Sequence, residues 1–69
     1  LAPEPEESDY EVIRYKNFRM KPMTVEEAIL QMNLLDHTFF MFKNEKTGLV
    51  NVVYKRDEGN YAVLVPEDE

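Results

Sequence analysis

The sequence predicts a small α+β domain of the order β-α-β-β-β, in which one helix packs on one face of a mostly antiparallel sheet. Three observations support this fold class. Residues 23–27 carry a helix-start motif and are followed by apolar residues at helical spacing. Three runs rich in β-branched and aromatic residues come next, separated by turn-forming residues. One run of mixed charged and apolar residues precedes the motif.

The first strand is predicted over Tyr10 to Met20, where charged residues alternate with apolar ones. Arg14 and Lys16 suit a strand at the edge of a sheet, because charge there discourages pairing with other chains. Pro22 is expected to end the strand, since proline has no N–H to donate to a sheet.

The helix is predicted to begin after Thr24 and to run to about Leu35, before Asp36 and His37 end it. Thr24 and Glu27 have the spacing of a capping box, in which each side chain accepts a hydrogen bond from the backbone N–H of the other residue. The inward-facing residues follow the 3.6-residue period. They are Val25, Ala28, Ile29, Met32 and Leu35.

Three further strands are predicted over residues 38–43, 49–56 and 61–65, joined by a hairpin loop at 44–48 and a tight turn at 57–60. Both faces of this meander are apolar, whereas a sheet with one solvated face alternates apolar and polar residues. A single short helix covers only one face. We assign to the helix the side that carries Phe40, Phe42, Val53 and Leu64.

The second face of the meander therefore needs another cover. If Asp57 pairs with Asn60 across the last turn, Tyr54 lies opposite Val63. An uncovered patch of several hundred Å² exceeds what a monomer usually exposes, and a twofold contact between two copies is the commonest cover. A contact with an upstream domain or with a different protein is the alternative. We expect a homodimer interface of six residues: Phe39, Met41, Val52, Tyr54, Tyr61 and Val63.

The charge distribution predicts how the chain is organised. The 69 residues suffice for one domain. Residues 1–9 carry a charge of −4, residues 10–66 a charge of +1 and residues 67–69 a charge of −3, which together give the net −6. We interpret 1–9 as an acidic Pro/Glu-rich linker from an upstream domain, 10–66 as the dimerisation domain and 67–69 as an acidic tail. The near-neutral domain has neither the positive charge typical of nucleic-acid binding nor the charge of a trap for acidic substrates, and no apolar run is long enough to span a membrane.

Candidate catalytic and ligand-binding residues are few. His37 stands beside Asp36, but adjacent residues rarely face each other, and no second His or Cys exists to accompany them. Glu26 and Glu27 are explained by the helix start, and the methionines by core packing. The cations at the hairpin ends are expected to form a solvated rim. They are Lys43, Lys46, Lys55 and Arg56. We therefore predict no catalytic residue, no cofactor, no metal site and no small-molecule substrate, and hence no enzyme.

Four stretches together resemble the C-terminal domain of long-form ribosome hibernation promoting factors, in the ribosome-associated translation inhibitor family. They are KNFRMKPM at residues 16–23, EEAILQMN at 26–33, HTFFMF at 37–42 and NVVYKRDEGNY at 51–61. The likeness extends over about residues 13–66. Residue 62 is alanine, where glycine is expected in much of the family. The departure bears on how the last strand packs in detail and not on the resemblance itself.

The resemblance implies a function. A domain of this family would dimerise, with Phe39 as the preferred interface residue, and an upstream domain would bind the small ribosomal subunit. Two copies would then join two ribosomes into a translationally inactive pair in a bacterial cytoplasm or a plastid. The alternative function is an adaptor that binds a different protein or ribosomal component through the second sheet face.

Overall fold

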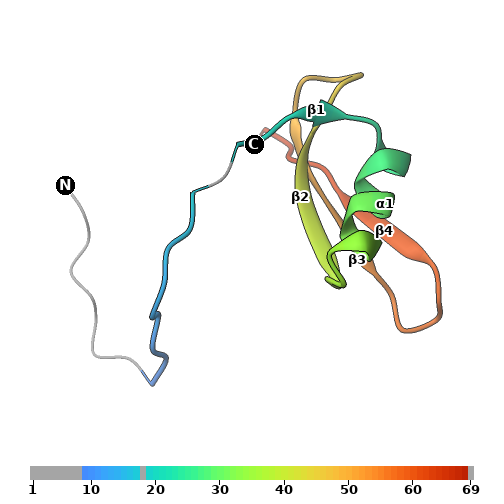
Figure 1. Cartoon of the computed structure of the whole chain (residues 1–69). Coiled ribbons are helices and arrows are strands. Elements are labelled where there is room, and N and C mark those ends of the chain that lie inside the picture. The colour runs from blue at the N-terminus through green and yellow to red at the C-terminus, as the bar shows by residue number, and fades with distance from the viewer. Residues whose placement is uncertain (1–8, 18, 69) are drawn as a thin grey trace.

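The computed structural model describes residues 9–17 and 19–68, and it confirms the predicted α+β fold class (Figure 1). The helix α1 (Val25–Leu34) lies against a four-stranded sheet whose strand order is β1-β2-β3-β4. The strands are β1 (Pro22–Met23), β2 (Phe39–Asn44), β3 (Val50–Lys55) and β4 (Tyr61–Leu64). β1 runs parallel to β2, and the other two pairings are antiparallel.

The first strand is much shorter than predicted. Apart from Phe18, which lies outside the described residues, the span Tyr10 to Met20 forms no strand, and only Pro22 and Met23 pair with β2. Pro22 begins the strand instead of ending the one before it. Because β1 is the edge of the sheet, the missing N–H of a proline is tolerated there. Residues 10–17 lie apart from the sheet in Figure 1, with no described strand beside them with which to pair.

The helix begins and ends with complete capping structures. The Glu27 N–H donates to the Thr24 hydroxyl at 3.1 Å, and the Thr24 N–H donates to the Glu27 carboxylate at 2.9 Å, which confirms the capping box. At the other end, the His37 N–H donates to the Met32 carbonyl and the Asp36 N–H to the Asn33 carbonyl. This is a Schellman arrangement, and it holds Asp36 in the left-handed region with φ 59°.

The core lies between α1 and the central strands β2 and β3. Ala28, Met32, Phe42 and Val53 are fully buried, and partly buried side chains, among them Phe40, pack against them. The expectation that Phe40, Phe42 and Val53 face the helix is confirmed. One polar side chain, Asn51, is also buried on this side of the sheet.

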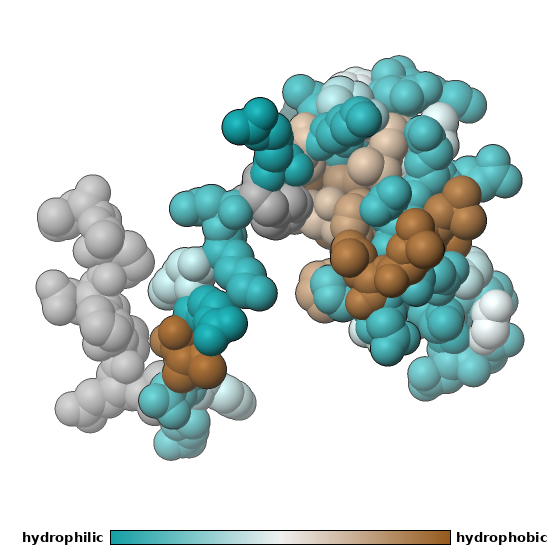
Figure 2. Space-filling view, viewed as in Figure 1, coloured by the Kyte–Doolittle hydropathy of each residue, from teal (hydrophilic) through white to brown (hydrophobic). Residues whose placement is uncertain are grey.

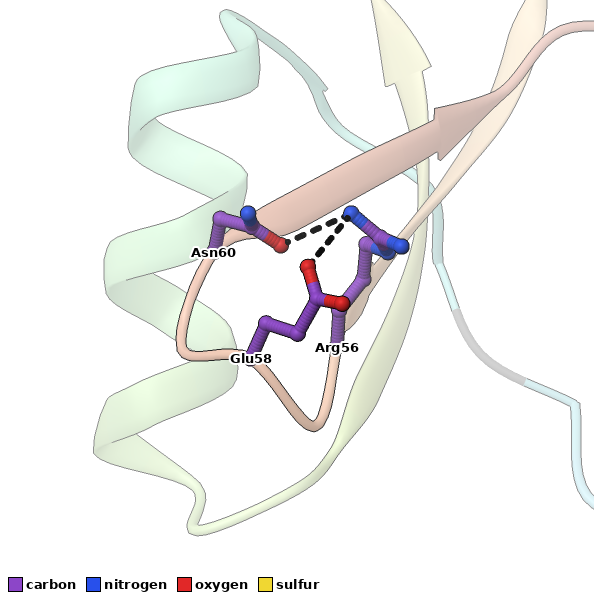
Figure 3. A network of polar contacts seen from close by, with 3 residues as sticks. All are labelled: Arg56, Glu58 and Asn60. Atoms are coloured by element: carbon purple, nitrogen blue, oxygen red, sulfur yellow. Dashed lines mark hydrogen bonds and ion pairs between the residues drawn. The ribbon is translucent and has the colours of Figure 1, made fainter.

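The hairpin between β3 and β4 has a different register from the predicted one. Arg56 and Asn60 close the turn, since the Arg56 N–H donates to the Asn60 carbonyl at 2.8 Å, and the first strand pair beyond it is Lys55 with Tyr61. The Arg56 guanidinium also contacts the Asn60 side-chain oxygen and the Glu58 carboxylate (Figure 3). The loop thus has three residues and ends on Gly59 with φ +89°, a common hairpin geometry.

The one-residue difference in register moves the side chains of β4 to opposite faces. Val63 pairs with Val53 and lies on the helix side of the sheet, whereas Leu64 pairs with Val52 on the other side. The predicted pairing of Tyr54 with Val63 is therefore wrong, and so is the placement of Leu64 beneath the helix.

Candidate interaction surface

The side of the sheet that faces away from α1 is apolar over three strands. Side chains alternate across a strand, so the buried helix-side residues Phe42 and Val53 identify the opposite set by register. We call this set the open face. Its apolar members are Phe39, Met41, Val50, Val52, Tyr54, Ala62 and Leu64, and Lys43 lies on the same side, opposite Val50.

The residues of the open face form continuous cross-strand rows. Phe39 lies opposite Tyr54, which in turn lies opposite Ala62, and the next row joins Met41, Val52 and Leu64. Phe39 is 62% exposed and Leu64 is 56% exposed, whereas Met41, Val52 and Tyr54 are half-buried by their neighbours. With aromatic side chains of about 150–250 Å² each, the exposed part of this patch is on the order of several hundred Å².

The structure brings together four of the six residues predicted for the interface. Phe39, Met41, Val52 and Tyr54 share the open face. Tyr61 and Val63 do not, because β4 presents them on the helix side. Tyr61 shows this directly, since its hydroxyl accepts a hydrogen bond of 3.4 Å from the Asn33 side chain of α1.

The prediction missed Val50, Ala62 and Leu64 as members of the open face. The signal that identifies the β4 residues is local: Gly59 suits the positive φ that a three-residue hairpin loop needs at its last position. A loop of that length, closed by Arg56 and Asn60, places Leu64 and Ala62 beside Val52 and Tyr54.

A second group of apolar side chains lies on the outer side of α1. Leu30 and Leu34 are 60% and 78% exposed, and each follows a buried residue, Ala28 or Met32, by two positions. Two residues correspond to about 200° around a helix, so these leucines point away from the sheet. Figure 2 shows strongly hydrophobic atoms across the part of the molecule where α1 lies in Figure 1.

The described residues contain no grouping that suggests catalysis or metal binding. His37 and Asp36 are both exposed at the end of α1. Within residues 9–17 and 19–68, no three His, Cys, Asp or Glu side chains come close enough together to hold a metal ion. In the same part of the chain, no helix has the length and apolar character that crossing a membrane requires.

Comparisons with known proteins agree with the resemblance noted in the sequence. The model of the family described as "Sigma 54 modulation/S30EA ribosomal protein C terminus" matches residues 7–63. The chain is 51% identical over 63 residues to the "Ribosome hibernation promotion factor" of Bacillus subtilis, which covers 91% of this chain and 33% of that protein.

Two other relatives come from a plant and a cyanobacterium. The chain is 46% identical over 72 residues to "Ribosome-binding factor PSRP1, chloroplastic" of Spinacia oleracea, which covers 97% of this chain and 24% of that protein. It is 50% identical over 56 residues to the "Ribosome hibernation promotion factor" of Picosynechococcus, which covers 81% of this chain and 29% of that protein. The chain therefore spans a quarter to a third of the length of these relatives.

Proposed function

Because this chain belongs to the Sigma 54 modulation/S30EA ribosomal protein C-terminus family, we propose that it is a homodimerisation module that joins two ribosome-bound copies of a hibernation factor. The two ribosomes would be paired in a translationally inactive dimer. The relatives in bacteria are named for ribosome hibernation and the chloroplast relative for ribosome binding, which supports this role and a location in the bacterial cytoplasm or a plastid.

The observation that carries the proposal is the open face. Its two outermost large side chains, Phe39 and Leu64, are more than half exposed, although they lie in a sheet whose other side is packed by the helix. A twofold axis through this face buries the same residues from both copies, which is the usual geometry of a homodimer. Tyr54 adds an aromatic ring with a polar end, a residue type that is enriched at such interfaces.

Self-association through this domain would work together with a tether. Residues 1–8 lie outside the described residues, and their Pro/Glu-rich composition is typical of a flexible linker. We propose that this linker connects the domain to an upstream ribosome-binding domain. When each copy is carried by a ribosome, the linker lets two domains meet while the open face supplies the binding energy.

The mass of the chain in solution tests this proposal. We expect sedimentation equilibrium over a series of concentrations to show a monomer–dimer equilibrium. A chain that remains monomeric at high concentration would refute the proposal and favour the adaptor function, in which the open face binds a different protein or ribosomal component.

Two neighbouring substitutions test the face as well as the oligomeric state. Leu64→Ala removes an exposed side chain of the open face, whereas Val63→Ala changes the adjacent residue on the helix side. We expect Leu64→Ala to weaken dimerisation by tenfold or more, since about 50 Å² of apolar area is lost in each copy, which is about 1 kcal/mol per copy and about 2 kcal/mol per dimer. Val63→Ala should leave the dimer constant within a few-fold. A larger loss of dimerisation in Val63→Ala than in Leu64→Ala would place the interface on the helix side.

A further inference from the structure

The open face is asymmetric in the size of its side chains. One row across the three strands begins with Phe39 on β2, continues with Tyr54 on β3 and ends with Ala62 on β4. Phe39 is 62% exposed at one edge of this row, whereas Ala62, at the other edge, is the smallest side chain of the face. A second copy that packs on this face must therefore match a protruding ring at β2 with a low surface at β4.

Two sheets that pack in the aligned manner can be related by a twofold axis in two ways. Their strands stay within about 30° of each other, so the axis runs either along the strands or across them. An axis along β3 exchanges β2 with β4, and Phe39 then meets Ala62 of the partner copy while Tyr54 meets its own equivalent. An axis across the strands places β2 on β2 in the reverse direction, and Phe39 then meets Lys43 of the partner copy.

The packing of side chains favours the axis along the strands. The core of a protein interface is close-packed, so a protruding ring needs a low surface opposite it. Ala62 offers such a surface to Phe39. With the axis across the strands, the same ring would cover the Lys43 ammonium group, and burial of an unpaired charge is unfavourable.

The charges at one end of the sheet favour the same axis. Lys43 is exposed at the end of the open face, and within the described residues it takes part in no salt bridge. β2 and β4 run in the same direction, because both pair antiparallel with β3, and the exposed Glu67 and Asp68 follow β4 at the Lys43 end of the sheet. When the axis exchanges β2 with β4, Lys43 of each copy comes next to these acids of the other copy, which is a complementary pairing of charges.

We propose that the open faces of two copies pack about a twofold axis parallel to β3, so that Phe39 of each copy lies on Ala62 of the other. The inference rests on the proposed dimerisation function and specifies its geometry. It assigns to Ala62 the role of receiving the partner's aromatic ring, and it places the open-face residues of β3 on the axis, each next to its own equivalent.

An exchange of the two side chains between copies tests this contact. Phe39→Ala leaves two gaps in its own dimer, and Ala62→Phe places ring against ring, so each variant alone should dimerise at least about tenfold more weakly than the unmodified chain. A mixture of the two variants has one large and one small side chain at both contacts. Sedimentation of fluorescently labelled Phe39→Ala, titrated with Ala62→Phe, should therefore show a heterodimer at least about tenfold tighter than either homodimer.

The direction of the axis has an independent test, because the chain has no cysteine. Packed sheets lie about 10 Å apart, which is beyond the reach of a disulfide, so a short bis-maleimide serves as the crosslinker. Tyr54→Cys should be crosslinked to its equivalent, since the proposed axis passes beside it. Met41→Cys should not, because the same axis places it against Leu64 of the partner copy, whereas an axis across the strands would bring the two Met41 positions together and separate the two Tyr54 positions.

The unmodified chain separates this inference from the function on which it rests. If it stays monomeric at high concentration, the dimerisation function is refuted and the geometry with it. If it dimerises but the mixed variants bind no more tightly than the tighter homodimer, or if Met41→Cys is crosslinked faster than Tyr54→Cys, the proposed axis is refuted and dimerisation stands. Far-UV circular dichroism checks the fold of each variant, and should Ala62→Phe fail to fold, the crosslinking of the two cysteine variants decides alone.

Discussion

Replacement of Phe39 by alanine is the most informative perturbation of the proposed interface. Phe39 is the most exposed of the large open-face side chains, and it begins β2 opposite Tyr54. Because it is not among the residues that pack against α1, its truncation should act on association more than on folding.

The size of the effect follows from the exposed area. Phe39 is 62% exposed, so with a typical aromatic side-chain area of about 200 Å² roughly 125 Å² is open to water. At about 25 cal/mol per Å², covering this area contributes about 3 kcal/mol per copy. Alanine keeps a small part of it, so the loss is about 2 kcal/mol per copy and about 4 kcal/mol per dimer. This corresponds to a roughly thousandfold weaker dimer.

Sedimentation equilibrium measures the change, and far-UV circular dichroism at low temperature checks that the helix is retained. Leu34→Ala is the matched control, because Leu34 is 78% exposed but lies on the outer side of α1. It should leave the dimer constant unchanged. An interface on the open face would be refuted if the dimer constant of Phe39→Ala stayed within about tenfold of that of the unmodified chain, or if Leu34→Ala weakened the dimer equally. Should Phe39→Ala unfold, Leu64→Ala removes less area from the same face and answers the same question.

Two predictions concern the stability of the domain, measured as the free energy of unfolding in urea. Asp36→Gly should stabilise the chain by about 0.5–1 kcal/mol, because glycine adopts the φ of 59° without the steric cost that aspartate has; a loss of stability would show that the Asp36 side chain contributes more than its backbone costs. Asn44→Ala should destabilise the chain by about 1–3 kcal/mol, because the Asn44 side chain donates at 2.9 Å to the buried Asn51 oxygen, whose own amide nitrogen already has no partner. Asn51→Val should leave the free energy of unfolding unchanged or raise it. An Asn51→Val variant that is less stable than Asn44→Ala would contradict this account.

Local features of the fold were predictable because their determinants are adjacent in the sequence. Thr24 and Glu27 define the helix start through two hydrogen bonds that span three residues, and the structure has both. The apolar period of the helix likewise identified Ala28 and Met32 as core residues. The central strands followed from their β-branched and aromatic composition.

The two errors arose where a distant partner or a single backbone angle decides the outcome. The segment Tyr10 to Met20 has the composition of a strand, but strand formation also requires an edge to pair with, which composition does not reveal. The register of β4 depends on whether the turn has two or three residues. The turn has three, because Gly59 adopts the positive φ that the last position of a three-residue loop requires. That one residue determines which side of β4 joins the open face, and so it separates Leu64 from Val63 as a candidate interface residue.

The small number of deeply buried side chains has a consequence for the cell. Only four apolar residues of the described chain, Ala28, Met32, Phe42 and Val53, are shielded completely. Domains this short retain little margin against unfolding when they stand alone. If pairing supplies part of that margin, the melting temperature must rise with protein concentration by mass action. The domain would then be harder to unfold in a cell where it is abundant than in one where it is dilute.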